Sequence, residues 1–152
     1  MAFVLDSLSW PELGLRLGGA VLIGLCLGYD RLSNNKPIGY QSYVIITVIT
    51  ALLAMLAIEL NAQFNTGDDF IRLDLGKIIS GVLTGIGFLG AGAITKRDED
   101  TVIGTATGAS IWAAGGLGLI IGFGHYVLAL VGFVVIWAVL AVIPYYLNTR
   151  KD

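Results

Sequence analysis

Charged side chains are scarce in this chain of 152 residues. Asp, Glu, Lys and Arg make up 13% of it, whereas hydrophobic residues make up 56% and the mean hydropathy is +0.82. A soluble domain has about 25% charged residues, because a compact body needs that much polar surface to meet water. With half that supply, a body of this size would expose much apolar surface. The composition therefore predicts a protein embedded in lipid.

Cysteine occurs only once, and basic runs and catalytic groupings are missing. The single cysteine, Cys26, excludes an intrachain disulfide and argues against a site of several thiolates. The net charge of −2 and the lack of a basic run argue against nucleotide or nucleic-acid binding. No Ser/His/Asp or Cys/His constellation is present, so we expect no enzyme. The residues before Pro11 hold no basic region and no long apolar run, so we expect no cleavable signal peptide.

Five long apolar segments divide the chain, approximately residues 12–29, 38–58, 78–95, 102–121 and 126–147. A membrane-spanning helix needs about 20 mostly apolar residues. Core helices of a soluble protein would need far more amphipathic helix around them. We therefore predict one domain over residues 1–152, an all-α bundle of five transmembrane helices. A cap at Asp68 or Asp69 would start the third helix earlier, and "KRDED" is expected to be a short charged loop.

The basic residues predict which side of the membrane each end faces. With the amino terminus outside, six basic residues lie on the inner side and three on the outer side, which the positive-inside rule favours. The inner set is Arg31, Lys36, Lys96, Arg97, Arg150 and Lys151, and the outer set is Arg16, Arg72 and Lys77. The expected orientation is N-out and C-in.

Glycine is abundant, with 21 residues. The stretch "SGVLTGIGFLGAGAIT" contains Gly85-x-Gly87-x-x-Gly90, the glycine spacing of a dinucleotide-binding loop. Such a loop needs a strand before it and a helix that opens within it, whereas these glycines lie inside an apolar segment. We interpret them as points where transmembrane helices pack closely, and so predict Gly-rich helix interfaces. Similar pairs are Gly14/Gly18, Gly24/Gly28, Gly81/Gly85, Gly104/Gly108 and Gly118/Gly122. The dense run 113–125 is predicted to loosen or break the fourth helix.

Few polar side chains lie within the spans, and two interpretations of them stay open. The hydroxyls either bond to helix carbonyls and neighbouring helices, or they form a polar track for an ion or a small solute. The candidates for the track are Thr47, Thr50, Ser80, Thr84 and Thr105, with Thr107 and Ser110 close to the last of these.

Three charged residues of the first segment are considered separately. Asp30 and Arg31 end that segment at the inner interface. A carboxylate at a helix C-terminus is electrostatically unfavourable, so a nearby basic group or a bound cation must offset Asp30. Asp30 is thus the one candidate metal ligand. Arg16 is expected to reach the outer interface or to pair with Glu12, four residues earlier.

Four stretches occur in the order seen in the MgtC/SapB family: "GLCLGYDR", "KPIGYQSY", "SGVLTGIGFLGAGAI" and "VIGTATGASIW". The chain resembles that family's membrane domain over nearly its whole length, and the third stretch is the most specific. The resemblance implies functional importance for Gly28, Asp30, Arg31, Pro37, Gly39, Gly85, Gly87, Phe88, Gly90, Gly92, Gly104, Thr107 and Trp112. Asp30 replaces the usual glutamate. Tyr40 and Gln41 occupy the positions where the family has Leu and Arg, and Ile103 occupies a position that is commonly arginine. Two cations of the inner side are therefore missing.

The resemblance also implies a function. It indicates a multi-pass protein of the bacterial plasma (inner) membrane, without the soluble C-terminal domain that many members carry. The family is associated with growth under magnesium limitation and with modulation of the membrane ATP synthase. We therefore expect a regulatory factor in magnesium or envelope homeostasis. It would act through helix–helix contacts, as a homo-oligomer or with a larger membrane protein, and would need no cofactor, with Mg²⁺ the one candidate ligand. The alternative is a channel or transporter for a cation or small solute, with Asp30 at its inner mouth.

Overall fold

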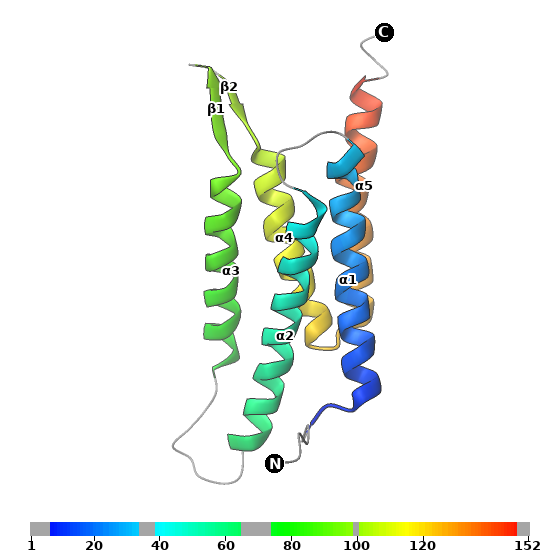
Figure 1. Ribbon diagram of the computed structural model, residues 1–152, viewed down its shortest axis with the longest axis vertical. Helices are drawn as coiled ribbons and strands as arrows, with labels where there is room; N and C mark the ends of the chain where they lie inside the picture. Colours follow the sequence, from blue (N-terminus) through cyan, green and yellow to red (C-terminus); the bar gives the residue numbers. More distant parts are fainter. Residues whose placement is uncertain (1–6, 34–38, 65–73, 99–100, 149–152) are drawn as a thin grey trace.

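Five helices run alternately up and down along one long direction in the computed structural model, which describes residues 7–33, 39–64, 74–98 and 101–148 (Figure 1). They are α1 (Trp10–Ser33), α2 (Tyr40–Phe64), α3 (Leu75–Gly92), α4 (Thr105–Gly122) and α5 (Tyr126–Asn148). At about 1.5 Å per residue, helices of this length match a hydrocarbon core of about 30 Å.

The helices have the length and composition of membrane spans. Four of them are long and apolar enough to cross a bilayer, over Trp10–Tyr29, Tyr40–Gln63, Leu75–Gly92 and Thr105–Gly122, and α5 is apolar over Tyr126–Ala141. Large apolar side chains also point outward: Phe88 is 80% exposed and Val127 is 78% exposed. An apolar exterior of this kind is suited to contact with lipid tails. The prediction of a bundle of five helices is confirmed, and four of the five meet the length and hydropathy of a transmembrane span.

α4 lies at the centre of the bundle. It packs against each of the other four helices, while α1 and α2 form the most extensive pair. Burial follows this arrangement, since 11 residues of α4 are buried but only Ile86 and Gly90 of α3. α3 is therefore peripheral, and α4 is its main contact with the rest of the bundle.

The segment between α3 and α4 is a β-hairpin, so the prediction of a charged loop is wrong. β1 (Thr95–Asp98) pairs antiparallel with β2 (Thr101–Ile103), with Thr95 opposite Ile103. Four β-branched residues in these strands favour extended backbone. For this reason α3 ends before Thr95, and α4 begins after Val102 rather than at it. α3 is capped by Asp74, whose side chain accepts from the Lys77 amide at 3.2 Å, while Asp68 and Asp69 lie outside the described residues.

The dense glycine run of α4 does not loosen the helix, contrary to prediction. α4 continues to Gly122, and the chain turns at Phe123–His125 before α5 begins. Gly115, Gly118 and Gly122 face neighbouring helices at distances that leave no room for a side chain. Close packing against those neighbours offsets the low helix propensity of glycine.

Candidate functional site

A layer of hydroxyl groups lies buried between α2 and α4. The Tyr43 hydroxyl and Ser110 Oγ are 2.7 Å apart, and Ser110 Oγ donates to the Thr107 carbonyl at 2.8 Å. Because the single Ser110 proton goes to that carbonyl, the Tyr43 hydroxyl is the donor to Ser110. Tyr43 is 0% exposed and Ser110 is 1% exposed. This bond therefore links the two helices away from solvent.

The threonines of α2 bond within their own helix. Thr47 Oγ1 donates to the Tyr43 carbonyl at 3.0 Å, and Thr50 Oγ1 donates to the Ile46 carbonyl at 2.9 Å. Both side chains are buried. The sequence left two interpretations of these hydroxyls open, a polar track or bonds to helix carbonyls. The bonds of Thr47 and Thr50 match the second interpretation.

The remaining candidates for a polar track lie elsewhere. Ser80 and Thr84 are exposed on α3, where Thr84 Oγ1 donates to the Ser80 carbonyl at 2.7 Å. Thr105 is exposed at the first residue of α4. The fold thus brings Thr47 and Thr50 into the interface that holds the buried Tyr43–Ser110 bond, but it does not bring Ser80, Thr84 or Thr105 there.

Two glycines of α1 lie directly against the backbone of α2. A Cβ at Gly24 would be 2.6 Å from Val44 Cα, and one at Gly28 would be 2.7 Å from Tyr40 Cα. Real Cβ atoms do not approach backbone this closely, so any side chain here would push the two helices apart. Gly28 belongs to the first family motif, and this close contact with α2 explains why a glycine stands there.

The glycines of the third family motif differ in their surroundings. A Cβ at Gly90 would be 2.9 Å from the Gly108 carbonyl oxygen, so α3 and α4 touch there through their backbones. Gly85 and Gly92 have nothing within 4 Å of such an atom, and Gly87 meets only the Trp112 side chain at 4.0 Å. One glycine of the motif therefore serves contact within the chain, while two lie open on the outer face of α3.

The fourth motif is located where the hairpin joins α4. Gly104 has φ +92°, and a Cβ there would collide with the Ala93 carbonyl oxygen. Thr107 is buried one turn later, and Trp112 is half-exposed on the following turn. Gly104 thus supplies the left-handed backbone conformation through which the hairpin leads into α4.

The first two motifs lie at the end of the bundle where α1 ends and α2 begins. Asp30 and Arg31 belong to the last turns of α1, and the positions of their side chains, like Pro37, lie outside the described residues. Gly39 precedes α2, and its carbonyl accepts from the Ser42 amide at 3.2 Å. Gln41 is exposed in the first turn. Within the described part of the chain, no group of three or more His, Cys, Asp or Glu could hold a metal ion.

Arg16 is buried rather than placed at the interface, and it does not pair with Glu12 as expected. Its side chain is 9% exposed, and Nη1 donates to the Gly122 carbonyl at 2.8 Å. Glu12 instead accepts from the Ser9 amide and hydroxyl, both at 3.0 Å. The sequence "SWPE" before an apolar run is a capping-box signature that could have predicted this use of Glu12.

Glu59 is a second buried charge that sequence reasoning missed. It is 7% exposed and accepts from the Leu8 amide at 2.9 Å and the Ser7 amide at 3.1 Å. It therefore ties the segment before α1 to α2. Nothing in the local sequence indicates this contact, because the partners are about 50 residues apart.

Comparison with known proteins places the chain in a family. The model of the MgtC family matches residues 17–148. SapB of Bacillus subtilis is 37% identical over 123 residues, which cover 78% of this chain and 52% of that protein. YhiD of Escherichia coli K12 is 32% identical over 135 residues, covering 86% and 60%. MgtC of Salmonella typhimurium LT2 is 29% identical over 122 residues, covering 80% and 48%.

The chain spans about half the length of the first curated relatives that it matches. No solved structure matches it. The family match covers four of the five helices completely and most of α1. With its apolar, membrane-length helices, the chain belongs to the MgtC family of multi-pass membrane proteins.

Proposed function

We propose that this chain is a regulatory protein of the bacterial plasma (inner) membrane, tied to magnesium limitation or envelope homeostasis. It would act by packing against a helix of a partner, either a second copy or a larger membrane protein. The link to magnesium rests on family membership and on the relative named "Putative magnesium transporter YhiD". No catalytic step is part of this proposal.

The observation that carries the proposal is the open face of α3. Gly81 and Gly85 lie one turn apart, and nothing is within 4 Å of where their side chains would be. Each glycine in a helix costs about 1 kcal/mol relative to alanine in water. At Gly90 close contact with α4 offsets that cost, but at Gly81 and Gly85 no contact with the described residues does so. Since helices in lipid associate through close packing at small residues, this face is suited to a partner helix.

Two further proposals concern the packing inside the bundle and its orientation in the membrane. We propose that Gly-rich interfaces, with Gly24, Gly28, Gly118 and Gly122 against α2, hold the helices together. We also propose the N-out, C-in orientation, which puts the β-hairpin and the α1–α2 connection in the cytoplasm. The excess of basic residues on that side supports it.

The test compares two substitutions on α3 in the bacterium of origin, with the chromosomal gene deleted and each variant supplied in its place. Gly85→Leu is expected to accumulate in the membrane at the wild-type level but to lose growth at limiting magnesium, because it blocks only the open face. Gly90→Leu is expected to lower the amount of protein itself, because the Gly108 carbonyl lies in the way. Wild-type growth of Gly85→Leu at wild-type protein level would overturn the proposal.

A carrier for a cation or small solute is the second candidate, favoured by the name of YhiD and by Asp30 in the last turns of α1. It is tested by reconstituting the purified chain in liposomes that enclose a fluorescent magnesium indicator. Magnesium entry that depends on the protein and is reduced in Asp30→Asn would establish this candidate. Entry at the rate of empty liposomes would exclude magnesium transport.

A further inference from the structure

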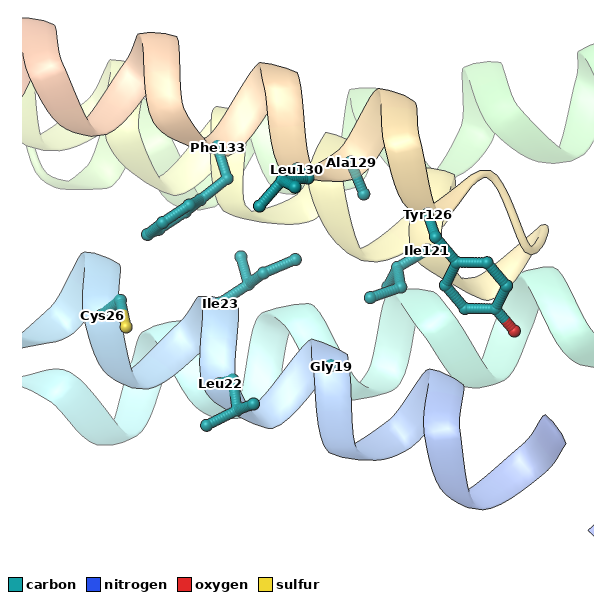
Figure 2. A pocket seen from close by; sticks show the side chains of 9 residues that line it. All are labelled: Gly19, Leu22, Ile23, Cys26, Ile121, Tyr126, Ala129, Leu130 and Phe133. Atoms are coloured by element: carbon teal, nitrogen blue, oxygen red, sulfur yellow. The ribbon is translucent and has the colours of Figure 1, made fainter. Parts of the chain in front are cut away.

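An apolar groove of about 270 Å³ lies between α1 and α5 on the surface of the bundle. The two helices barely touch one another, and Ile121 of α4 forms part of the floor. Figure 2 shows Cys26 and Phe133 toward one end of the groove and Tyr126 at the other. The Tyr126 hydroxyl is the only oxygen or nitrogen among the lining side chains, and it points toward the N-terminal part of α1.

A buried cation lies next to the Tyr126 end of the groove. Arg16 precedes the lining residue Gly19 by about one turn of α1, and its Nη1 donates to the carbonyl of Gly122, next to Ile121. A Cβ at Gly124 would be 3.0 Å from Arg16 Nη2, so the guanidinium lies against the turn that leads into Tyr126. Any side chain at Gly124 would crowd Nη2.

Among the residues that the structure describes, this guanidinium has no carboxylate at ion-pair distance, and the exposed Glu12 carboxylate acts on it only from farther away. Arg16 is 9% exposed, it forms no ion pair with a described carboxylate, and its Nε is buried without a hydrogen-bond partner. Arginine stays protonated in proteins, and a buried charge without a counter-ion is strongly unfavourable. The planar fork of N–H donors matches a phosphate group better than any other common anion except a carboxylate.

We propose that the groove binds a phospholipid from the leaflet that holds the N-terminal end of α1. One acyl chain lies along the groove past Ile23 to Phe133, and the phosphate accepts hydrogen bonds from Arg16 Nη2 and the Tyr126 hydroxyl. The occupant is a lipid because the groove is apolar along its length, lies between two apolar helices and ends beside a buried cation that has no ion-pair partner among the described residues. A second copy of the chain would bring no phosphate to Arg16.

The test measures lipid binding to the purified chain in detergent by native mass spectrometry. The probes are palmitoyl-oleoyl phosphatidylglycerol and a diacylglycerol with the same chains. We expect phosphatidylglycerol to bind at least about tenfold more tightly, the effect of one charge-assisted hydrogen bond. Arg16→Gln should remove this preference and Tyr126→Phe should reduce it. Lys77→Gln, which removes an 86% exposed cation on α3, should leave it unchanged.

A second measurement uses Cys26, the single thiol of the chain. Phosphatidylglycerol should slow its reaction with N-ethylmaleimide, and inorganic phosphate should not. Equal binding of the two lipids to wild type, or equal protection by inorganic phosphate, would overturn the proposal. The proposal would also be overturned if the protection of Cys26 depended on the protein-to-detergent ratio and not on the lipid. In that case a second copy of the chain would cover the groove. If Arg16→Gln does not fold, an unchanged lipid preference in Tyr126→Phe is decisive against the site.

Discussion

Gly104 joins the hairpin to α4 with a positive φ of +92°, a conformation that residues with a side chain rarely adopt. A side chain there also meets the Ala93 carbonyl oxygen. Both constraints act on one residue of the family motif, and together they explain why glycine is needed there without any ligand.

Gly104→Ala is therefore expected to lower the free energy of unfolding by about 1–3 kcal/mol, the cost of a strained backbone conformation. Thermal unfolding in detergent, followed by the fluorescence of the 3 tryptophans, measures the change. Gly18→Ala is the control, because nothing lies within 4 Å of that site and its helical backbone accepts alanine. Equal melting temperatures for the two variants would contradict the account of Gly104.

Glu59→Gln should weaken the attachment of the segment before α1. The carboxylate accepts two amide hydrogen bonds in a buried place, and the neutral amide is a weaker acceptor, so we expect a loss of about 1–3 kcal/mol. Hydrogen exchange at the Leu8 amide should accelerate. Asp74→Asn is the comparison variant, because it alters an exposed cap of α3, and it should lower the free energy of unfolding less than Glu59→Gln does. Unchanged exchange at Leu8 in Glu59→Gln would show that the bond contributes little.

At the scale of helices, α4 contains a matched pair of glycines. A Cβ at Gly118 would meet the Thr50 side chain and would be 2.5 Å from the Thr47 carbonyl oxygen, whereas one at Gly116 has nothing within 4 Å. The two positions share a helix and the same intrinsic propensity. They differ in packing against α2.

Gly118→Ala is accordingly expected to destabilise the bundle by about 1–3 kcal/mol through overpacking. Gly116→Ala should stabilise it by up to about 1 kcal/mol through helix propensity. Equilibrium unfolding in mixed micelles with increasing dodecyl sulfate compares the two variants with the wild type. Opposite signs support close contact at Gly118, and stabilisation by both would argue against it.

The sequence predicted the helices well because apolar runs of membrane length leave few alternatives. It could not predict the hairpin, because β1 and β2 are short and their extended backbone depends on pairing with one another. Arg16 was misplaced because its partner is a carbonyl 106 residues away, whose position depends on how α1 and α4 pack. The glycine motif was correctly placed within a helix, but only the fold separates Gly90, which is packed, from Gly85, which is open.

At the scale of the whole molecule, the hairpin and the α4–α5 turn lie toward opposite ends of the bundle (Figure 1). With Cys26 replaced by serine, Thr101→Cys and His125→Cys give single thiols at these two places, both of which are exposed. In the N-out orientation, a membrane-impermeant maleimide should label His125→Cys in intact spheroplasts. It should label Thr101→Cys only in inverted vesicles. The reverse pattern would overturn the orientation.

The central place of α4 has a consequence for biogenesis. Helices enter a membrane in chain order, and α4 follows α1, α2 and α3. α1 and α2 pack extensively on one another and can pair as soon as both are inserted. α3 has almost no contact other than α4, so it must wait in the lipid until the translocon releases the next span. The hairpin between them pairs the end of α3 with the start of α4, so α3 and α4 can pack together as soon as α4 is delivered.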